Sequence, residues 1–156
     1  MRQGLLIFAS IALLLSGRSF AAEGTVTFNG TVLPSCLITI GTPGTLAADA
    51  SYSQISSKNV GGIAGTASVV ATAPTFSLST TAPVAFTSAP AGGGDDVTFA
   101  STYSTNGVTS VTDVAGGVAT QLGLGLTNVD VDLTATKASG AFPAGNYVAD
   151  VTITCE

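Results

Sequence analysis

The side chains of this 156-residue chain that best suggest a catalytic or metal site are two cysteines and nine carboxylates. The chain has no histidine, so neither a Ser-His-Asp nor a Cys-His arrangement can be built. A hydrolase with paired carboxylates needs two acids that converge in one cleft. Such enzymes usually also have aromatic platforms for a sugar, and tryptophan is absent. The residue inventory therefore predicts that the protein is not an enzyme.

Two pairs of acids offer hard oxygen ligands for calcium, namely Asp95 with Asp96 in a glycine-rich stretch, and Asp130 with Asp132. The Asp-x-Asp-x-Asp-Gly spacing of a calcium-binding loop does not occur. Asp130 and Asp132 also alternate with apolar residues such as Val131, which places both acids on the polar face of a strand. We therefore expect solvated carboxylates, with no metal and no cofactor.

The two cysteines, Cys36 and Cys155, favour one intramolecular disulfide, because an even pair in an exported protein is most simply bridged. Such a bridge joins the start of the second expected strand to the end of the last. Free or intermolecular thiols are the alternative. Two thiolates without histidine make a poor metal site.

Residues 1–21 have the features of a secretory signal peptide, with Arg2 followed by the apolar run Leu5–Leu15 and small residues before a cleavage site after Ala21. The run is too short for a permanent membrane span, which needs about 20 apolar residues. Without this segment, two lysines face nine carboxylates, a net charge of about −7. A charge of this sign excludes most nucleic-acid partners, which need basic patches. The sequence thus predicts an exported acidic protein.

The remaining residues predict a single all-β domain. Valine and threonine favour strands, glycine and proline punctuate turns, and no stretch has a useful helical period. We expect Asn106-Gly107 to form a tight hairpin turn, and residues 45–62 to be a polar connection. The expected strands are 24–36, 37–40, 63–73, 75–80, 84–87, 97–103, 108–114, 118–126, 129–134 and 147–155.

The two ends of the chain alternate most clearly. The first contains Gly24-Thr-Val-Thr-Phe-Asn-Gly-Thr-Val-Leu-Pro-Ser-Cys36, and the last is Ala144-Gly-Asn-Tyr-Val-Ala-Asp-Val-Thr-Ile-Thr-Cys-Glu156. Together with the export signal, these segments resemble a chaperone–usher pilus subunit. They are most similar to the spore coat protein U-type subunits of archaic pili.

The resemblance implies an incomplete immunoglobulin-like β-sandwich that is completed by a donor strand from a neighbouring subunit. It divides the chain into a signal peptide at 1–21, an N-terminal donor-strand extension at 22–34 and a pilin domain at 35–156. The donor residues are then Val26, Phe28, Gly30 and Val32, and the strand lining the acceptor groove carries Tyr147, Ala149, Val151 and Ile153.

The partners that the resemblance implies are a periplasmic pilus chaperone, an outer-membrane usher and further pilin subunits in a head-to-tail filament. The protein would pass through the periplasm to a cell-surface pilus that serves adhesion or biofilm formation. The alternative is a self-contained secreted β-sandwich, acting as a ligand-binding or surface-coat protein, in which residues 24–33 pair within their own domain.

Overall fold

The computed structural model describes residues 20–156, which contain ten β-strands and no helix. The predicted all-β class is thereby confirmed. Most of the predicted signal peptide lies outside the described residues, and no helix within them is long and apolar enough to cross a membrane. The strands are β1 Cys36–Ile40, β2 Ala47–Ala48, β3 Gln54–Ser56, β4 Gly65–Ala71, β5 Ser77–Thr81, β6 Val97–Gly107, β7 Val111–Ala115, β8 Thr120–Gln121, β9 Gly125–Lys137 and β10 Thr152–Cys155.

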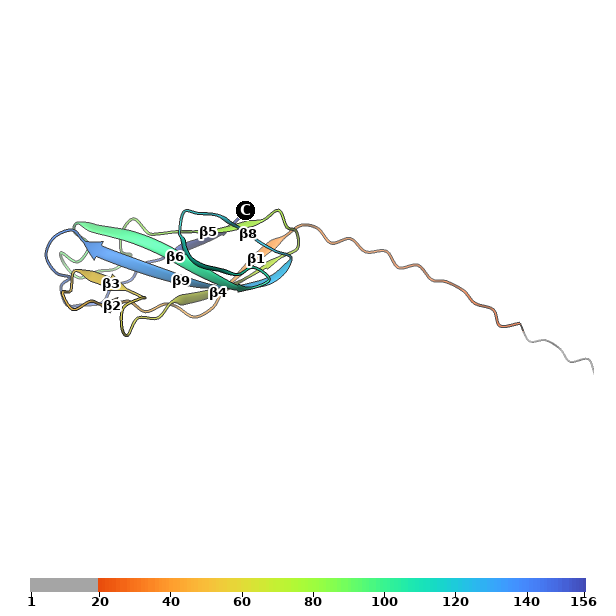
Figure 1. Cartoon of the computed structure of the whole chain (residues 1–156), viewed down its shortest axis with the longest axis horizontal. Coiled ribbons are helices and arrows are strands. Elements are labelled where there is room, and N and C mark those ends of the chain that lie inside the picture. Colours follow the sequence, from red (N-terminus) through yellow and green to blue (C-terminus); the bar gives the residue numbers. More distant parts are fainter. Residues whose placement is uncertain (1–19) are drawn as a thin grey trace, which may run out of the picture. The chain divides into compact units, whose positions relative to one another are not determined.

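The long strand β9 organises the larger, seven-stranded antiparallel sheet (Figure 1). On one side β9 pairs with β6 along nearly its whole length. On the other side its first half pairs with β4 and its second half with β3. The strands β1, β2 and β7 lie outside β4, β3 and β6, so β1 is an edge strand.

The smaller sheet has the order β10–β5–β8, again antiparallel. Side chains from both sheets meet in one apolar cluster, in which Val69, Leu78, Tyr103 and Val129 are fully buried. The Tyr103 hydroxyl is satisfied in this cluster by the carbonyl oxygens of Leu78 and Val118 and by a threonine hydroxyl. Alternating small and β-branched residues on β4 and β9 give each strand one apolar face, which is why the two sheets pack together.

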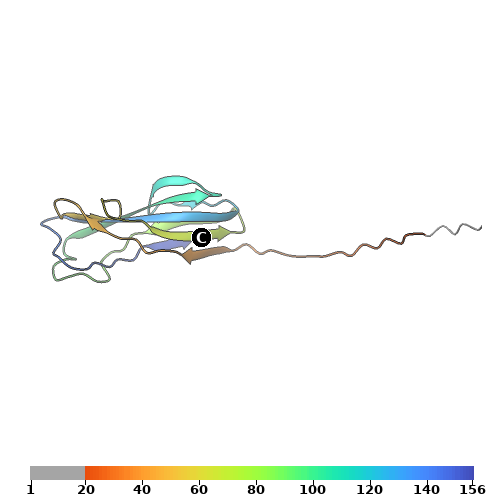
Figure 2. The ribbon, with the colours of Figure 1, turned by 90° about the horizontal axis from the view of Figure 1, so that it is seen from below.

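A disulfide joins Cys36 to Cys155, with 6.4 Å between their Cα atoms. The predicted intramolecular bridge is therefore present, and it ties the start of β1 to the end of β10. In Figure 2 the C-terminus lies beside the brown-orange arrow of β1, where this bridge is made. Because one strand leaves the disulfide and the other arrives at it, β1 and β10 run in opposite directions.

Several strand predictions were wrong in detail. Residues 20–35 form no strand, and neither do residues 84–87. The segment 147–151 makes only a single bridge, from Val148 to Ser88, before β10 begins. The expected polar connection at 45–62 contains β2 and β3. β3 pairs with β9 and β2 with β3, and these pairings are set by tertiary contacts rather than by the strands' own pattern.

The Asn106-Gly107 turn was also misplaced. Both residues belong to β6, which continues to Gly107 because β9 offers it a partner that far. Only Gly107 has a positive φ, of 113°, and the chain reverses in the residues that follow.

Candidate functional site: a groove between two strand edges

An open groove of about 1050 Å³ lies between the connection that follows β1 and the segment that leads into β10. Its floor contains the apolar side chains of Ile55 from β3 and of Val131 and Leu133 from β9. One wall is the chain from Ile40 to Leu46. The other wall comprises residues 142–151, together with Ile153.

The β1 wall presents a free backbone edge to the groove. Ser35 and Gly41 flank β1. The Ser35 carbonyl oxygen accepts from the Thr72 N–H, and the Gly41 N–H donates to the Thr66 carbonyl oxygen, both on the β4 side. In an antiparallel pair, alternate residues carry the ladder bonds. The odd-numbered residues of β1 therefore bond β4, and the N–H and C=O groups of Ile38 and Ile40 are directed away from β4 toward the open edge.

The opposite wall has the same property. The Val148 N–H donates to the Ser88 carbonyl oxygen at 2.8 Å, and its carbonyl oxygen accepts from the N–H groups of Thr87 at 2.7 Å and Ser88 at 3.3 Å, so its backbone faces away from the groove. Within residues 20–156, Ala149 and Val151 make no backbone hydrogen bond. Their N–H and C=O groups alternate with those of Val148 and so are directed into the groove.

The four residues predicted for this wall are brought together by the structure. Tyr147, Ala149, Val151 and Ile153 all line the groove and are all half-buried. Val148 and Asp150, between them, are exposed. Half-buried and exposed residues alternate along this segment, although Val148 and Asp150 also border the groove and 147–151 lies outside a regular ladder.

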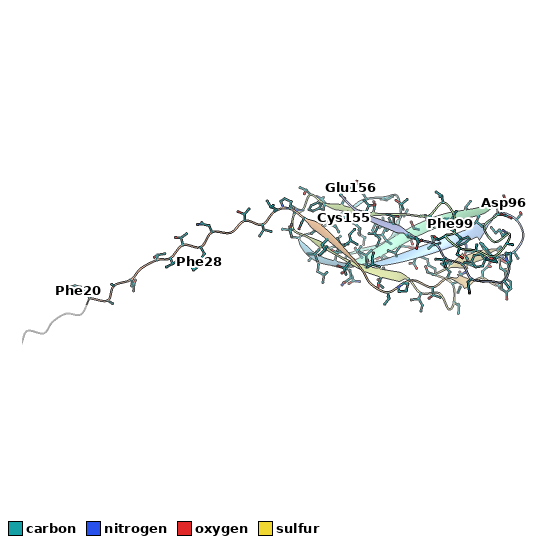
Figure 3. The ribbon with its side chains drawn as sticks, turned by 180° about the vertical axis from the view of Figure 1, so that it is seen from behind. Phe20, Phe28, Asp96, Phe99, Cys155 and Glu156 are labelled. Carbon is teal, nitrogen blue, oxygen red and sulfur yellow. A yellow bond between two sulfur atoms is a disulfide. The ribbon has the colours of Figure 1, made fainter. Side chains whose placement is uncertain are left out.

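The groove differs at its two ends. At one end the disulfide holds β1 and β10 together. The opposite end is flanked by an aromatic cluster. The ring centroid of Phe86 lies 4.8 Å from that of Phe99 and 5.0 Å from that of Tyr147, and the ring centroids of Phe142 and Tyr147 are 5.4 Å apart. Figure 3 labels Cys155 and Asp96, which lie toward these two opposite ends of the domain.

Tyr147 joins this cluster to the groove. Its hydroxyl donates to the carbonyl oxygen of Pro143 at 2.6 Å, and burial raises the pKa of the phenol above its ordinary value of 10.0. Sequence reasoning missed Phe142 and Leu46, which line the groove from irregular connections. Because neither lies in a periodic segment, only their apolar type inside polar loops could have marked them.

The predicted donor residues lie in a segment of different character. Residues 20–35 belong to no strand, and Val26, Phe28 and Val32 are 74%, 90% and 81% exposed. Their alternating apolar side chains are therefore available to solvent. A Cβ on Gly30 would meet no atom within 4 Å.

The acidic residues form no comparable site. Among the described residues no three potential metal ligands gather. Asp132 accepts a hydrogen bond from Ser57 at 2.6 Å. Asp113 pairs with Lys58, whose hydrogen bond lowers the pKa of this exposed carboxyl.

Neither models of known protein families nor curated proteins match this chain. Its function must therefore be argued from the groove and from the exposed N-terminal segment.

Proposed function

We propose that the protein is a structural subunit of a chaperone–usher pilus that polymerises by donor-strand exchange. The observation that carries the proposal is the apolar groove between residues 40–46 and the segment 142–153, where Ile40 at the end of β1 and the pair Ala149 and Val151 have backbone groups without a partner strand. An apolar groove with free edges fits an extended peptide, since main-chain hydrogen bonds give affinity and alternate side chains fill the floor. On this proposal the two sheets are an immunoglobulin-like sandwich that lacks one strand, and the groove is the place of that strand.

The same chain supplies a suitable ligand. Residues 22–34 carry Val26, Phe28 and Val32 on one face, all exposed, with Gly30 among them. Burial of three such side chains in a neighbour's groove contributes about 5–9 kcal/mol before ordering costs. Because the donating and accepting surfaces differ, the contact is head-to-tail and builds an open filament.

The pattern of free backbone groups limits the registers open to an inserted strand to those that differ by two residues. In an antiparallel pair, directly opposed residues place their side chains on the same face. Among the registers that align the apolar face of the extension with the inward face of the wall, we propose the one that sets Phe28 opposite Val151 and Gly30 opposite Ala149. Val32 then lies at the aromatic end of the groove and Val26 at the disulfide end.

An exposed apolar groove with two open edges is an aggregation hazard for a free subunit. We therefore include in the proposal a periplasmic chaperone that covers the groove before assembly and an outer-membrane usher that receives the subunit. The subunit would end in a cell-surface filament serving adhesion or biofilm formation.

The first test is an unheated SDS gel of the mature chain isolated from an oxidising periplasm. We expect a ladder of subunit multiples that collapses on boiling without reductant. Phe28→Asp should abolish the ladder, because it places a charge on the groove floor. Thr27→Asp, which adds the same charge on the opposite face of the extension, should preserve the ladder.

The register can be tested separately by paired cysteines on the outward face. Asn29→Cys should cross-link to Asp150→Cys of the next subunit, since the register places them opposite one another at a distance suited to a disulfide. Asn29→Cys with Val148→Cys, shifted by two residues, should not cross-link. A soluble monomer with no ladder would instead indicate a self-contained secreted sandwich that binds a ligand or coats a surface.

A further inference from the structure

A row of exposed apolar side chains crosses the outer face of the larger sheet near the start of β1. Leu37 pairs with Val70, and Val70 pairs with Leu126, so these three side chains are direct cross-strand neighbours. Val108 continues the row, since its N–H donates to the Leu126 carbonyl oxygen at 3.1 Å. We call these four residues the apolar row; they are 62%, 38%, 50% and 51% exposed in the order given.

The next set of cross-strand neighbours on this face, beside the apolar row, carries no charge. This set lies two residues further along each strand and consists of polar residues that oppose one another across the sheet, namely Thr39, Ser68, Asn128 and Asn106. The first carboxylate in this direction, that of Asp130, lies two residues beyond Asn128, opposite Thr66. In a subunit with a net charge of about −7, two copies meet with least repulsion at a surface of this kind.

We propose that the apolar row packs against the body of the next subunit, outside the groove, and stiffens the head-to-tail junction. This inference rests on the proposed donor-strand function. The shortness of the connection between the inserted segment and the row supports the inference, because Leu37 follows Val32 by only five residues. With Val32 seated at the aromatic end of the neighbour's groove, the Cα of Leu37 lies within about 18 Å of it.

The counterpart on the neighbour is Tyr52, which lines the same end of the groove from the turn between β2 and β3. Its side chain is 60% exposed and its φ is 56°, a conformation that a bulky residue rarely adopts. The turn is held in place by hydrogen bonds from Phe142 N–H to the Tyr52 carbonyl oxygen, at 2.7 Å, and from Tyr52 N–H to the Asp49 carbonyl oxygen. A strained, well-anchored and exposed tyrosine at the groove rim is suited to receive an apolar surface.

The test measures how fast assembled filaments dissociate into subunits, read from unheated gels over time at raised temperature. Val70→Thr with Leu126→Thr keeps the strand preference and the charge, and should raise the dissociation rate roughly tenfold. Val108→Thr alone changes a residue between β6 and β7 and should also raise the dissociation rate. This single variant is a safeguard in case the double variant misfolds. Val60→Thr with Val84→Thr is the matched control, because both valines are fully exposed and lie outside the row.

Tyr52→Asn keeps a residue that tolerates positive φ and should accelerate dissociation to a similar extent. Combined with the row variant, it should add little, because both remove the same contact. Additive effects would overturn the pairing of the row with Tyr52. Row variants that dissociate at the wild-type rate would overturn the proposal. Row variants that lose only the bundling of filaments would also overturn it, because the row would then make contacts between filaments. In each of these results the subunit multiples are still seen on the unheated gel. Their absence in the wild type would instead refute the proposed function.

Discussion

Removal of the disulfide is the sharpest perturbation of the subunit itself. The bridge spans 119 residues of sequence, so it constrains nearly the whole domain in the unfolded state. The chain-entropy relation gives about 5 kcal/mol for a loop of this length. Since the free energy of unfolding of small domains is about 5–15 kcal/mol, the double variant Cys36→Ser with Cys155→Ser should be marginal or unfolded near body temperature.

Urea unfolding followed by circular dichroism measures this loss on the mature chain. With a denaturant slope of about 2 kcal/mol per molar, the midpoint should fall by about 2–3 M. Wild-type protein treated with reductant should show the same fall, and the Thr27→Asp variant should show none. A midpoint within about 0.5 M of the wild type would refute the argument that the bridge stabilises the domain by restricting its unfolded chain.

Three further substitutions test other parts of the domain. Tyr103→Phe should lower the free energy of unfolding by about 1–3 kcal/mol, measured in urea, because it removes the hydroxyl that donates to the carbonyl oxygen of the fully buried Leu78 at 3.1 Å. Gly107→Ala should destabilise the end of β6, because its φ is 113° and a Cβ would lie 2.6 Å from a carbonyl oxygen of β9; an unchanged thermal midpoint would contradict this. Asp49→Asn should lower the thermal midpoint slightly at pH 7, since hydrogen bonds, chiefly from Ser51, hold the Asp49 pKa below its ordinary value of 3.8. That stabilisation is present above pH 3.8 and is lost as pH falls through the lowered pKa, so variant and wild type should converge once the pH lies below that pKa.

The alternation of residue types determined most of what could be predicted about the wall of the groove. Side chains at 147, 149, 151 and 153 share one face of any extended chain, and all four residues border the groove and are half-buried. The pairing of Cys36 with Cys155 followed from the export signal and an even count, with no geometry required. The all-β class followed from valine, threonine and the absence of a helical period.

Tertiary structure decided the rest. Whether an extended segment becomes a ladder depends on the availability of a partner edge, so residues 24–35 alternate without forming a strand, while the polar stretch 54–56 becomes β3 beside β9. The aromatic end of the groove is assembled from Phe86, Phe99 and Phe142, which are far apart in sequence and carry no shared period. The residue order thus set which faces are apolar, and only the folded chain decided which of those faces remains open.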